Sequence, residues 1–274
     1  MSVGRHFINP LQPLRRIGRV LSSNLGTARY YFGHTQNRFN DADLPGDTVL
    51  MIHGFFQTPR VMETLERRLR ADGFRPISFN LGGLFWNFNT RGVPTLAKRI
   101  DEKIRRFQER SGVQKIHIVG HSMGGLVARY LVQVEGGADY ASTVITLGTP
   151  HHGTPTAAIG AGMGLLFVSH AMWQIFPMSP LIKRLNEEPF PEGVRLVSVY
   201  SKHDLVCPWR SSVLTEKDGK KVRNILVKEL GHMGLVEDPW VYGLVVRELS
   251  ERPIDPASGP VALSSGLGTR PLGS

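Results

Sequence analysis

A serine lies among glycines near the middle of the sequence, in the stretch GHSMG of residues 120–124. A β-branched and apolar run, residues 114–120, precedes it directly, and a helical pattern begins at the serine itself. A sharp strand-to-helix turn exposes the serine side chain and needs small residues two positions away on either side, here Gly120 and Gly124. We interpret Ser122 as a candidate nucleophile and Gly125 as a site of close helix packing. A glycine-rich turn with a helix-capping serine is the alternative.

The elements that must position Ser122 follow from the pattern of apolar residues along the chain. Short apolar runs predict strands at residues 47–53, 74–80, 114–120, 142–148, 194–201 and 222–230. Amphipathic runs predict helices at 58–72, at 95–112, from 122 onward and at 235–249. Because strands and helices alternate, we expect an α/β fold with a mostly parallel sheet. Two long connections, 81–93 and 149–191, interrupt the alternation, and loops of that length are usually functional.

The charge is concentrated at the N-terminus. The chain has 274 residues, 41% of them hydrophobic, and a formal net charge of +10. Residues 1–40 contain six arginines and no Asp, Glu or Lys. We predict a basic N-terminal extension over 1–40 that contacts an anionic membrane surface, with a solvated tail as the alternative. No nucleic-acid partner is expected. Residues 251–274, rich in Pro, Gly and Ser, are predicted to be a disordered tail.

Cysteine use and apolar runs bear on the compartment. The one cysteine, Cys207, excludes an intramolecular disulfide, and the N-terminal residues show no continuous apolar run typical of a secretory signal. We therefore expect a cytoplasmic protein that is peripheral to a membrane at most. The uncharged stretch 157–177 is nearly long enough to span a bilayer, but its polar residues and glycines make a transmembrane helix the less favoured interpretation.

Three stretches together resemble a known family. They are IVGHSMGGLVARY (118–130), VITLGTPHHGT (144–154) and IHGFFQ (52–57). The chain from 48 to 248 is similar to the α/β-hydrolase superfamily, in particular its bacterial triacylglycerol lipase and esterase branch. The resemblance implies an α/β-hydrolase catalytic domain over 41–250, with a mostly parallel central sheet flanked by helices. It also implies a lid or cap insertion, about 154–191, after the strand at 142–148.

The resemblance implies a catalytic triad in the chain order Ser, acid, His. Among the histidines only His232 follows the last expected strand, so it matches the base. Asp204 follows the strand at 194–201 and matches the acid. The family often has D-x-x-V-P here, whereas this chain has DLVCP, with Cys207 at the position of the valine. Asp218, in an expected hairpin turn, and Asp238, at an expected helix start, are the competing acids.

The resemblance also implies an oxyanion hole formed by two backbone N–H groups. Met123, which follows the nucleophile, supplies one of them. Phe55, in the HGFF stretch of residues 53–56, supplies the other, and Phe56 remains an alternative donor. Gly54 lets this loop approach the nucleophile, and His53 is expected to brace the loop rather than take part in chemistry.

The expected function is that of a serine carboxylic-ester hydrolase acting on lipid or other acyl esters. The predicted substrate-binding residues are apolar: Phe56, Phe85, Trp86, Leu166 and Phe167. An acyltransferase or thioesterase that uses the same triad is one alternative, and a non-enzymatic binding relative is another. We expect no cofactor and no metal, since His151 and His152 are adjacent and point apart, and no acid pair for a calcium ion is evident.

Overall fold

A parallel sheet forms the centre of the computed structural model, which describes residues 18, 20–24, 46–84, 88–156, 170–215 and 222–251. Its six strands are ordered β2-β1-β5-β6-β7-β8, and every neighbouring pair is parallel. They are β1 (Thr48–Ile52), β2 (Arg75–Ser78), β5 (Ile116–His121), β6 (Ala141–Leu147), β7 (Arg195–Ser201) and β8 (Val222–Val227). The sequence predicted all six strands, and the largest error is at the end of β8.

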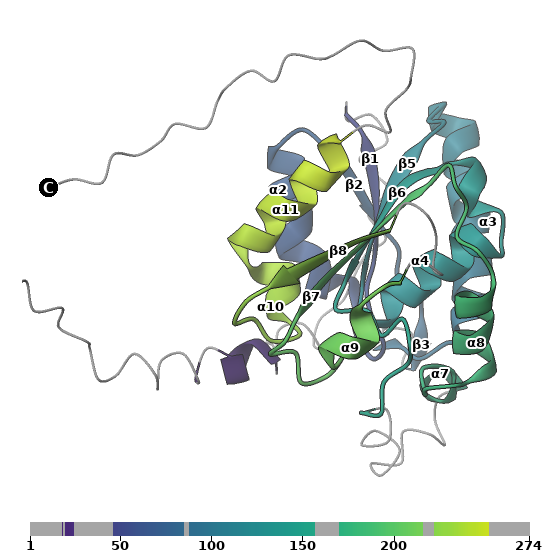
Figure 1. Ribbon diagram of the computed structural model, residues 1–274. Helices are drawn as coiled ribbons and strands as arrows, with labels where there is room; N and C mark the ends of the chain where they lie inside the picture. The colour runs from purple at the N-terminus through teal and green to yellow at the C-terminus, as the bar shows by residue number, and fades with distance from the viewer. Residues whose placement is uncertain are drawn as a thin grey trace, which may run out of the picture.

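Helices cover both faces of the sheet (Figure 1). On one face lie α2 (Glu63–Ala71) and α11 (Pro239–Ser250), and on the other lie α3 (Val93–Ser111) and α4 (Met123–Gln133). Side chains of β1 alternate between the two cores, because Val49 and Met51 pack with α2 and α11 whereas Leu50 and Ile52 pack with α3 and α4. Burial on both faces explains why β1 is a nearly continuous apolar run, whereas the edge strand β8 is partly exposed and carries polar residues.

Two predicted helices are divided in the structure. The segment 58–72 begins with the 3-10 turn η2 (Pro59–Met62) before α2. The closing segment 235–249, predicted as one helix, is two: α10 (Gly234–Glu237) and α11. The break occurs at Asp238, which has an extended backbone and accepts hydrogen bonds from the N–H groups of Trp240 and Val241. Asp238 is thus the N-cap of α11, as expected of a helix-start acid, and Pro239 takes the first helical position.

The two long connections contain regular structure that the sequence analysis did not predict. Between β2 and α3, residues 83–84 (β3) and 88–89 (β4) pair as a small antiparallel sheet. Between β6 and β7 lie α7 (His170–Gln174) and α8 (Pro180–Glu187). The fully buried guanidinium of Arg129, on α4, donates a hydrogen bond of 2.6 Å to the Leu185 carbonyl and so ties α8 to the sheet.

Several predictions fall on residues that the structure does not describe. The expected lid or cap is described only at 154–156 and 170–191, so most of the apolar stretch 157–177 lies outside the described residues. The same holds for the tail after residue 251 and for all of 1–40 except residues 18 and 20–24. Among the helices that are described, none is both long enough and apolar enough to cross a membrane.

Candidate active site

Ser122 occupies the turn between β5 and α4 with a backbone conformation that L-residues rarely adopt. Its φ is 56° and its ψ is −128°. The Ser122 N–H donates to the Leu147 carbonyl at 2.9 Å, and its carbonyl accepts a hydrogen bond from the Thr149 hydroxyl at 2.9 Å. The end of β6 therefore holds the strained turn in place. Strain of this kind, fixed by its surroundings, is typical of functional sites.

Three glycines make this turn possible. A Cβ on Gly120 would lie 2.7 Å from the carbonyl oxygen of Gly124, so Gly120 makes room within the turn as expected. A Cβ on Gly124 would lie 2.1 Å from the Ile52 carbonyl oxygen, and one on Gly125 would lie 2.0 Å from Oγ1 of Thr149. The role of close helix packing, predicted for Gly125 alone, is therefore shared with Gly124, which lets α4 approach β1.

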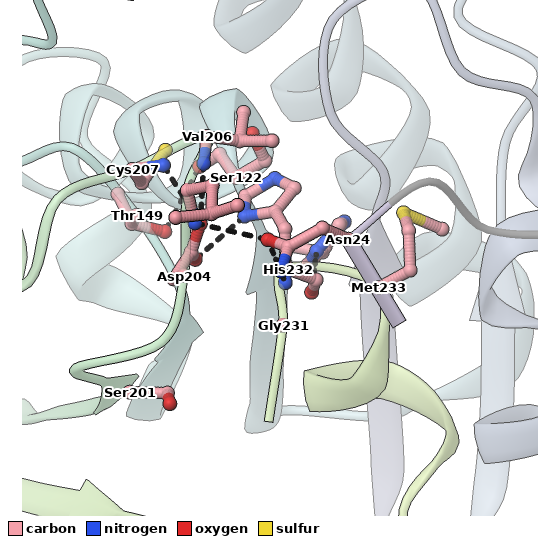
Figure 2. Close-up of polar contacts among 12 residues, drawn as sticks. Asn24, Ser122, Thr149, Ser201, Asp204, Val206, Cys207, Gly231, His232 and Met233 are labelled. Atoms are coloured by element: carbon pink, nitrogen blue, oxygen red, sulfur yellow. Dashed lines mark hydrogen bonds and ion pairs between the residues drawn. The ribbon is translucent and has the colours of Figure 1, made fainter. Parts of the chain in front are cut away.

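Asp204 and His232 form a buried hydrogen-bonded pair beside Ser122 (Figure 2). Oδ2 of Asp204 lies 2.7 Å from Nδ1 of His232, and the two residues are only 4% and 3% exposed. The other carboxylate oxygen accepts the N–H groups of Val206 at 2.9 Å and Cys207 at 2.8 Å. Because a carboxylate only accepts, Nδ1 of His232 carries the proton and Nε2 is left to accept one. The departure of the DLVCP loop from D-x-x-V-P does not prevent this pairing.

His121, next to the serine, packs against the His232 ring and lies within hydrogen-bonding distance of the His232 carbonyl. The two imidazole centroids are 4.6 Å apart, and Nε2 of His121 lies 3.2 Å from the His232 carbonyl oxygen. Its Nδ1 lies 3.1 Å from Oε1 of Gln57. Burial, followed by the proximity of His232, lowers the pKa of His121 well below its usual range, so the ring is neutral.

The loop after β1 lies against the nucleophile. A Cβ on Gly54 would be 2.7 Å from Cβ of Ser122, so only glycine permits this approach. The Gly54 N–H donates to Oε1 of Gln57 at 2.7 Å, and its carbonyl accepts the side-chain amide of Asn89 at 3.2 Å. His53 is fully buried behind the loop, with Nδ1 3.3 Å from the Gly54 carbonyl oxygen, and burial lowers the pKa of His53 to about 4.

The geometry of this loop favours one of the two candidate oxyanion donors. The N–H of Phe56 donates to the Asn89 carbonyl at 2.7 Å, and Phe56 has a φ of 52°. Among the hydrogen bonds of the described residues, none uses the N–H of Phe55 or of Met123. The engaged amide of Phe56 thus leaves Phe55 and Met123 as the pair of available donors.

An apolar cavity of about 380 Å³ opens over Ser122 and His232. Most of its apolar lining comes from four segments: Phe55, Phe56, Met172, Ile175, Leu205, Val206 and Met233. Of the predicted substrate-binding residues, Phe56 lines the cavity, whereas Phe85, Trp86, Leu166 and Phe167 lie outside the described residues. The sequence analysis missed the apolar neighbours of the acid and the base, although their position beside Asp204 and His232 in the sequence was an available signal.

Cys207, His151 and His152 are also reactive side chains, and their contacts are those of structural residues. The buried Cys207 thiol lines the cavity together with Ser122, and burial, followed by the proximity of Asp204, raises the pKa of Cys207 well above its ordinary value. The imidazole of His151 contacts the Thr146 hydroxyl at 3.0 Å. That of His152 contacts the Val213 carbonyl at 2.9 Å. Within the described ranges there is no cluster of three His, Cys, Asp or Glu residues that could hold a metal ion.

A family model described as the alpha/beta hydrolase fold matches residues 47–168, which contain β1, the elbow at Ser122 and β6. The chain has the α/β-hydrolase fold. Solved structures of this fold are similar over most of this α/β-hydrolase. Aspergillus fumigatus lipase B superimposes with a TM-score of 0.62 and 16% identity, covering 83% of this chain and 60% of the lipase. An esterase from Exiguobacterium antarcticum gives a TM-score of 0.59 and 18% identity, covering 76% and 93%.

Curated relatives match this α/β-hydrolase over shorter stretches. Triacylglycerol lipases of Pseudarthrobacter phenanthrenivorans and Burkholderia plantarii are each 28% identical over 117 residues, which is 40% of this chain. A GPI inositol-deacylase of Candida albicans is 32% identical over 144 residues, which is half of this chain. The matches span 34%, 31% and 29% of those proteins, so the chain matches about a third of the length of its curated relatives.

Proposed function

We propose that this α/β-hydrolase is a serine carboxylic-ester hydrolase that cleaves acyl esters with Ser122, His232 and Asp204. The observation that carries the proposal is the buried Asp204–His232 pair, 2.7 Å apart, whose histidine lines an apolar cavity together with Ser122. Acyl transfer requires a serine nucleophile beside a histidine that a carboxylate orients. Here Ser122 lies in the cavity wall on a strained turn.

In the acylation step, Oγ of Ser122 attacks the ester carbonyl carbon while Nε2 of His232 takes the hydroxyl proton. The carbonyl oxygen becomes negative and accepts hydrogen bonds from the N–H groups of Phe55 and Met123. Met123 begins α4, so the positive end of the helix dipole also favours this charge. The tetrahedral intermediate then expels the alcohol, which leaves with the proton from His232, and an acyl-Ser122 ester remains.

In the deacylation step, His232 takes a proton from water and the hydroxide attacks the acyl carbon. The bond to Oγ of Ser122 breaks, Ser122 regains its proton from His232, and a carboxylic acid leaves. Asp204 stays ionised throughout and stabilises the imidazolium that forms twice in each cycle. Its second oxygen, fixed by two backbone N–H groups, keeps the carboxylate from rotating away.

The cavity lining supports an apolar acyl group as the substrate class. A cavity of about 380 Å³ lies in the range of small-molecule sites, and Ser122 and His232 lie in its mostly apolar wall. Similarity to proteins named triacylglycerol lipase and GPI inositol-deacylase agrees with a lipid ester. Contact with an anionic membrane stays a prediction of the sequence, because all six arginines of 1–40 lie outside the described residues.

The deciding experiment compares the wild-type protein with Ser122→Ala. We expect the wild type to hydrolyse p-nitrophenyl esters and to react with a fluorophosphonate probe, and Ser122→Ala to do neither while it keeps its melting temperature. Ser111→Ala is the matched control, because Ser111 ends α3 at the opposite edge of the sheet and bonds only the local Phe107 and Val113 backbone.

Three outcomes are informative. Mass spectrometry should find the probe on Ser122 and nowhere else. Wild-type protein that is inert toward both the esters and the probe would contradict the proposed function and favour a non-enzymatic binding role. Product that carries an added alcohol or thiol acceptor, in place of free acid, would assign acyl transfer instead of hydrolysis to the same triad.

A further inference from the structure

A helical segment from the far N-terminus, residues 20–24, lies against the two loops that carry Asp204 and His232. Figure 2 shows Asn24 beside Gly231, His232 and Met233. The bonded positions are 179 to 208 residues apart in the sequence. The sequence analysis placed this segment in a basic extension, outside the catalytic domain, so its place at the site is new information from the structure.

The side-chain amide of Asn24 bridges the acid loop and the histidine loop. Its oxygen accepts the N–H of Leu205 at 2.9 Å and the N–H of His232 at 3.1 Å. Its nitrogen donates to the carbonyls of Val20 at 2.8 Å and His203 at 3.1 Å. All four hydrogen-bonding positions of the amide are used, and two donors and two acceptors around it fix which end is oxygen. No other side chain of this size offers the same set.

Ser23 completes the attachment of the histidine loop. Its hydroxyl accepts the N–H of Gly231 at 2.7 Å, and its carbonyl accepts the N–H of Met233 at 2.7 Å. With the bond from His232 to Asn24, three consecutive N–H groups of the loop donate to residues 23 and 24. Buried N–H groups that lose their partner cost free energy, so the loop conformation depends on this segment.

Two glycines of the histidine loop are shaped to receive the segment. A Cβ on Gly231 would lie 2.4 Å from the Asn24 side-chain nitrogen, and a Cβ on Gly234 would lie 3.2 Å from Cβ of Ser23. Neither has a positive φ, so backbone conformation does not require glycine at these positions. The space that they leave is filled by Ser23 and Asn24. This complementarity is independent of the hydrogen bonds and supports the same docking.

We propose that Asn24 is a positioning residue for the triad, which fixes the acid loop and the histidine loop relative to each other. The proposal rests on the function proposed above. Asn24 bonds the backbone of His232 itself and of the residue after Asp204, so its amide sets the separation that the 2.7 Å bond between the two side chains needs. Ser23 and Asn24 are thus part of the catalytic unit, and Asn24 also forms part of the cavity wall.

The first test measures the docking without using activity. Hydrogen–deuterium exchange is compared for the wild type, Asn24→Leu, Asn24→Asp and the control Leu21→Ala, whose side chain is exposed on the same segment. Peptides covering 203–207 and 230–234 should exchange faster in Asn24→Leu. They should be partly protected in Asn24→Asp, which keeps an acceptor oxygen, and unchanged in Leu21→Ala. Unchanged exchange in Asn24→Leu would overturn the proposal whatever the protein catalyses.

The second test measures reactivity per active site. For Asn24→Leu we expect kcat on a short p-nitrophenyl ester, and the rate of fluorophosphonate labelling at Ser122, to fall by about tenfold or more, with KM little changed. Asn24→Asp should recover part of the loss, and Leu21→Ala should match the wild type. A rise in KM at constant kcat would contradict positioning and assign Asn24 to the cavity wall alone. An inert wild type would contradict the proposed function instead, and the exchange experiment still decides the docking.

Discussion

Replacing Asp204 by Asn tests the assignment of the acid, because the structure dictates how the new amide must orient. The carboxylate receives three hydrogen bonds, from Nδ1 of His232 and from the N–H groups of Val206 and Cys207. An asparagine has one accepting oxygen and one donating nitrogen. If its oxygen serves the two backbone N–H groups, its NH₂ group faces Nδ1 of His232. That ring nitrogen must then accept, and the imidazole proton moves to Nε2, which can no longer take the proton of Ser122.

The opposite orientation of the introduced amide costs more free energy. Its NH₂ group would face the two backbone donors and leave both unsatisfied in a buried loop, at about 1–3 kcal/mol each. The first orientation therefore predominates and holds His232 in the inactive tautomer. The same exchange in an unrelated serine-hydrolase triad lowers kcat by about 10⁴-fold, equivalent to about 5 kcal/mol of transition-state stabilisation. We expect Asp204→Asn to lose activity on this scale while it remains folded.

The assay is steady-state hydrolysis of a p-nitrophenyl ester together with the rate of fluorophosphonate labelling, with the melting temperature measured in parallel. Asp238→Asn is the matched control, because Asp238 caps α11 and asparagine is an equally good N-cap. Its activity and stability should equal those of the wild type. If Asp204→Asn retains more than a tenth of the wild-type rate, the acid has been assigned wrongly and the tautomer argument fails.

Three further predictions follow from packing, burial and charge. Gly124→Ala should lower the free energy of unfolding, measured by urea titration, by about 2 kcal/mol because the new Cβ meets the Ile52 backbone. Gly243→Ala, which has open space on α11, should raise the free energy of unfolding by about 1 kcal/mol. Equal effects of the two substitutions would refute the close approach of α4 to β1. Burial lowers the pKa of His53 to about 4 from the ordinary 6.5, so as pH falls His53 is protonated in the unfolded chain before it is protonated in the folded protein. Stability should therefore be lost as pH falls through this window, by about 3 kcal/mol from His53, and His53→Gln should flatten the pH dependence of the urea midpoint. Deleting residues 1–17 should weaken binding to anionic but not neutral vesicles while esterase activity is kept; equal binding by the deleted protein would refute the anchor.

The parts of the fold that the sequence predicted are those encoded locally. Apolar runs predicted the strands because most of them are buried on both faces, although the edge strand β8 is largely exposed; the elbow followed from a strand, a serine and a helix in direct succession. The closing helix was predicted as one element because its apolar period continues across Asp238. The helix is divided there because Asp238 caps the N-terminus of α11 and Pro239, at its first position, has no N–H to continue the preceding helix.

The candidate site was less predictable where contacts join distant segments. The sequence left Phe55 and Phe56 as alternative oxyanion donors, and the choice depends on Asn89, whose carbonyl engages the Phe56 amide. Asn89 lies in a connection that was expected to be a loop. A two-residue strand has no detectable period, so no pattern in the sequence could place its carbonyl beside the nucleophile.

The N-terminal segment shows how an average over composition can hide a specific contact. Residues 1–40 were set apart because they contain six arginines and no Asp, Glu or Lys, yet Ser23 and Asn24 contact the catalytic loops through uncharged groups. Their partners at Gly231 and Gly234 follow the last strand, where glycine is common in loops and carries no signal alone. A chain shortened to 41–250, the boundaries that the sequence suggested, would lose the bonds to three consecutive amides around His232. We therefore expect the shortened chain to be less active than the protein lacking only 1–17, although both lack arginines of the basic segment.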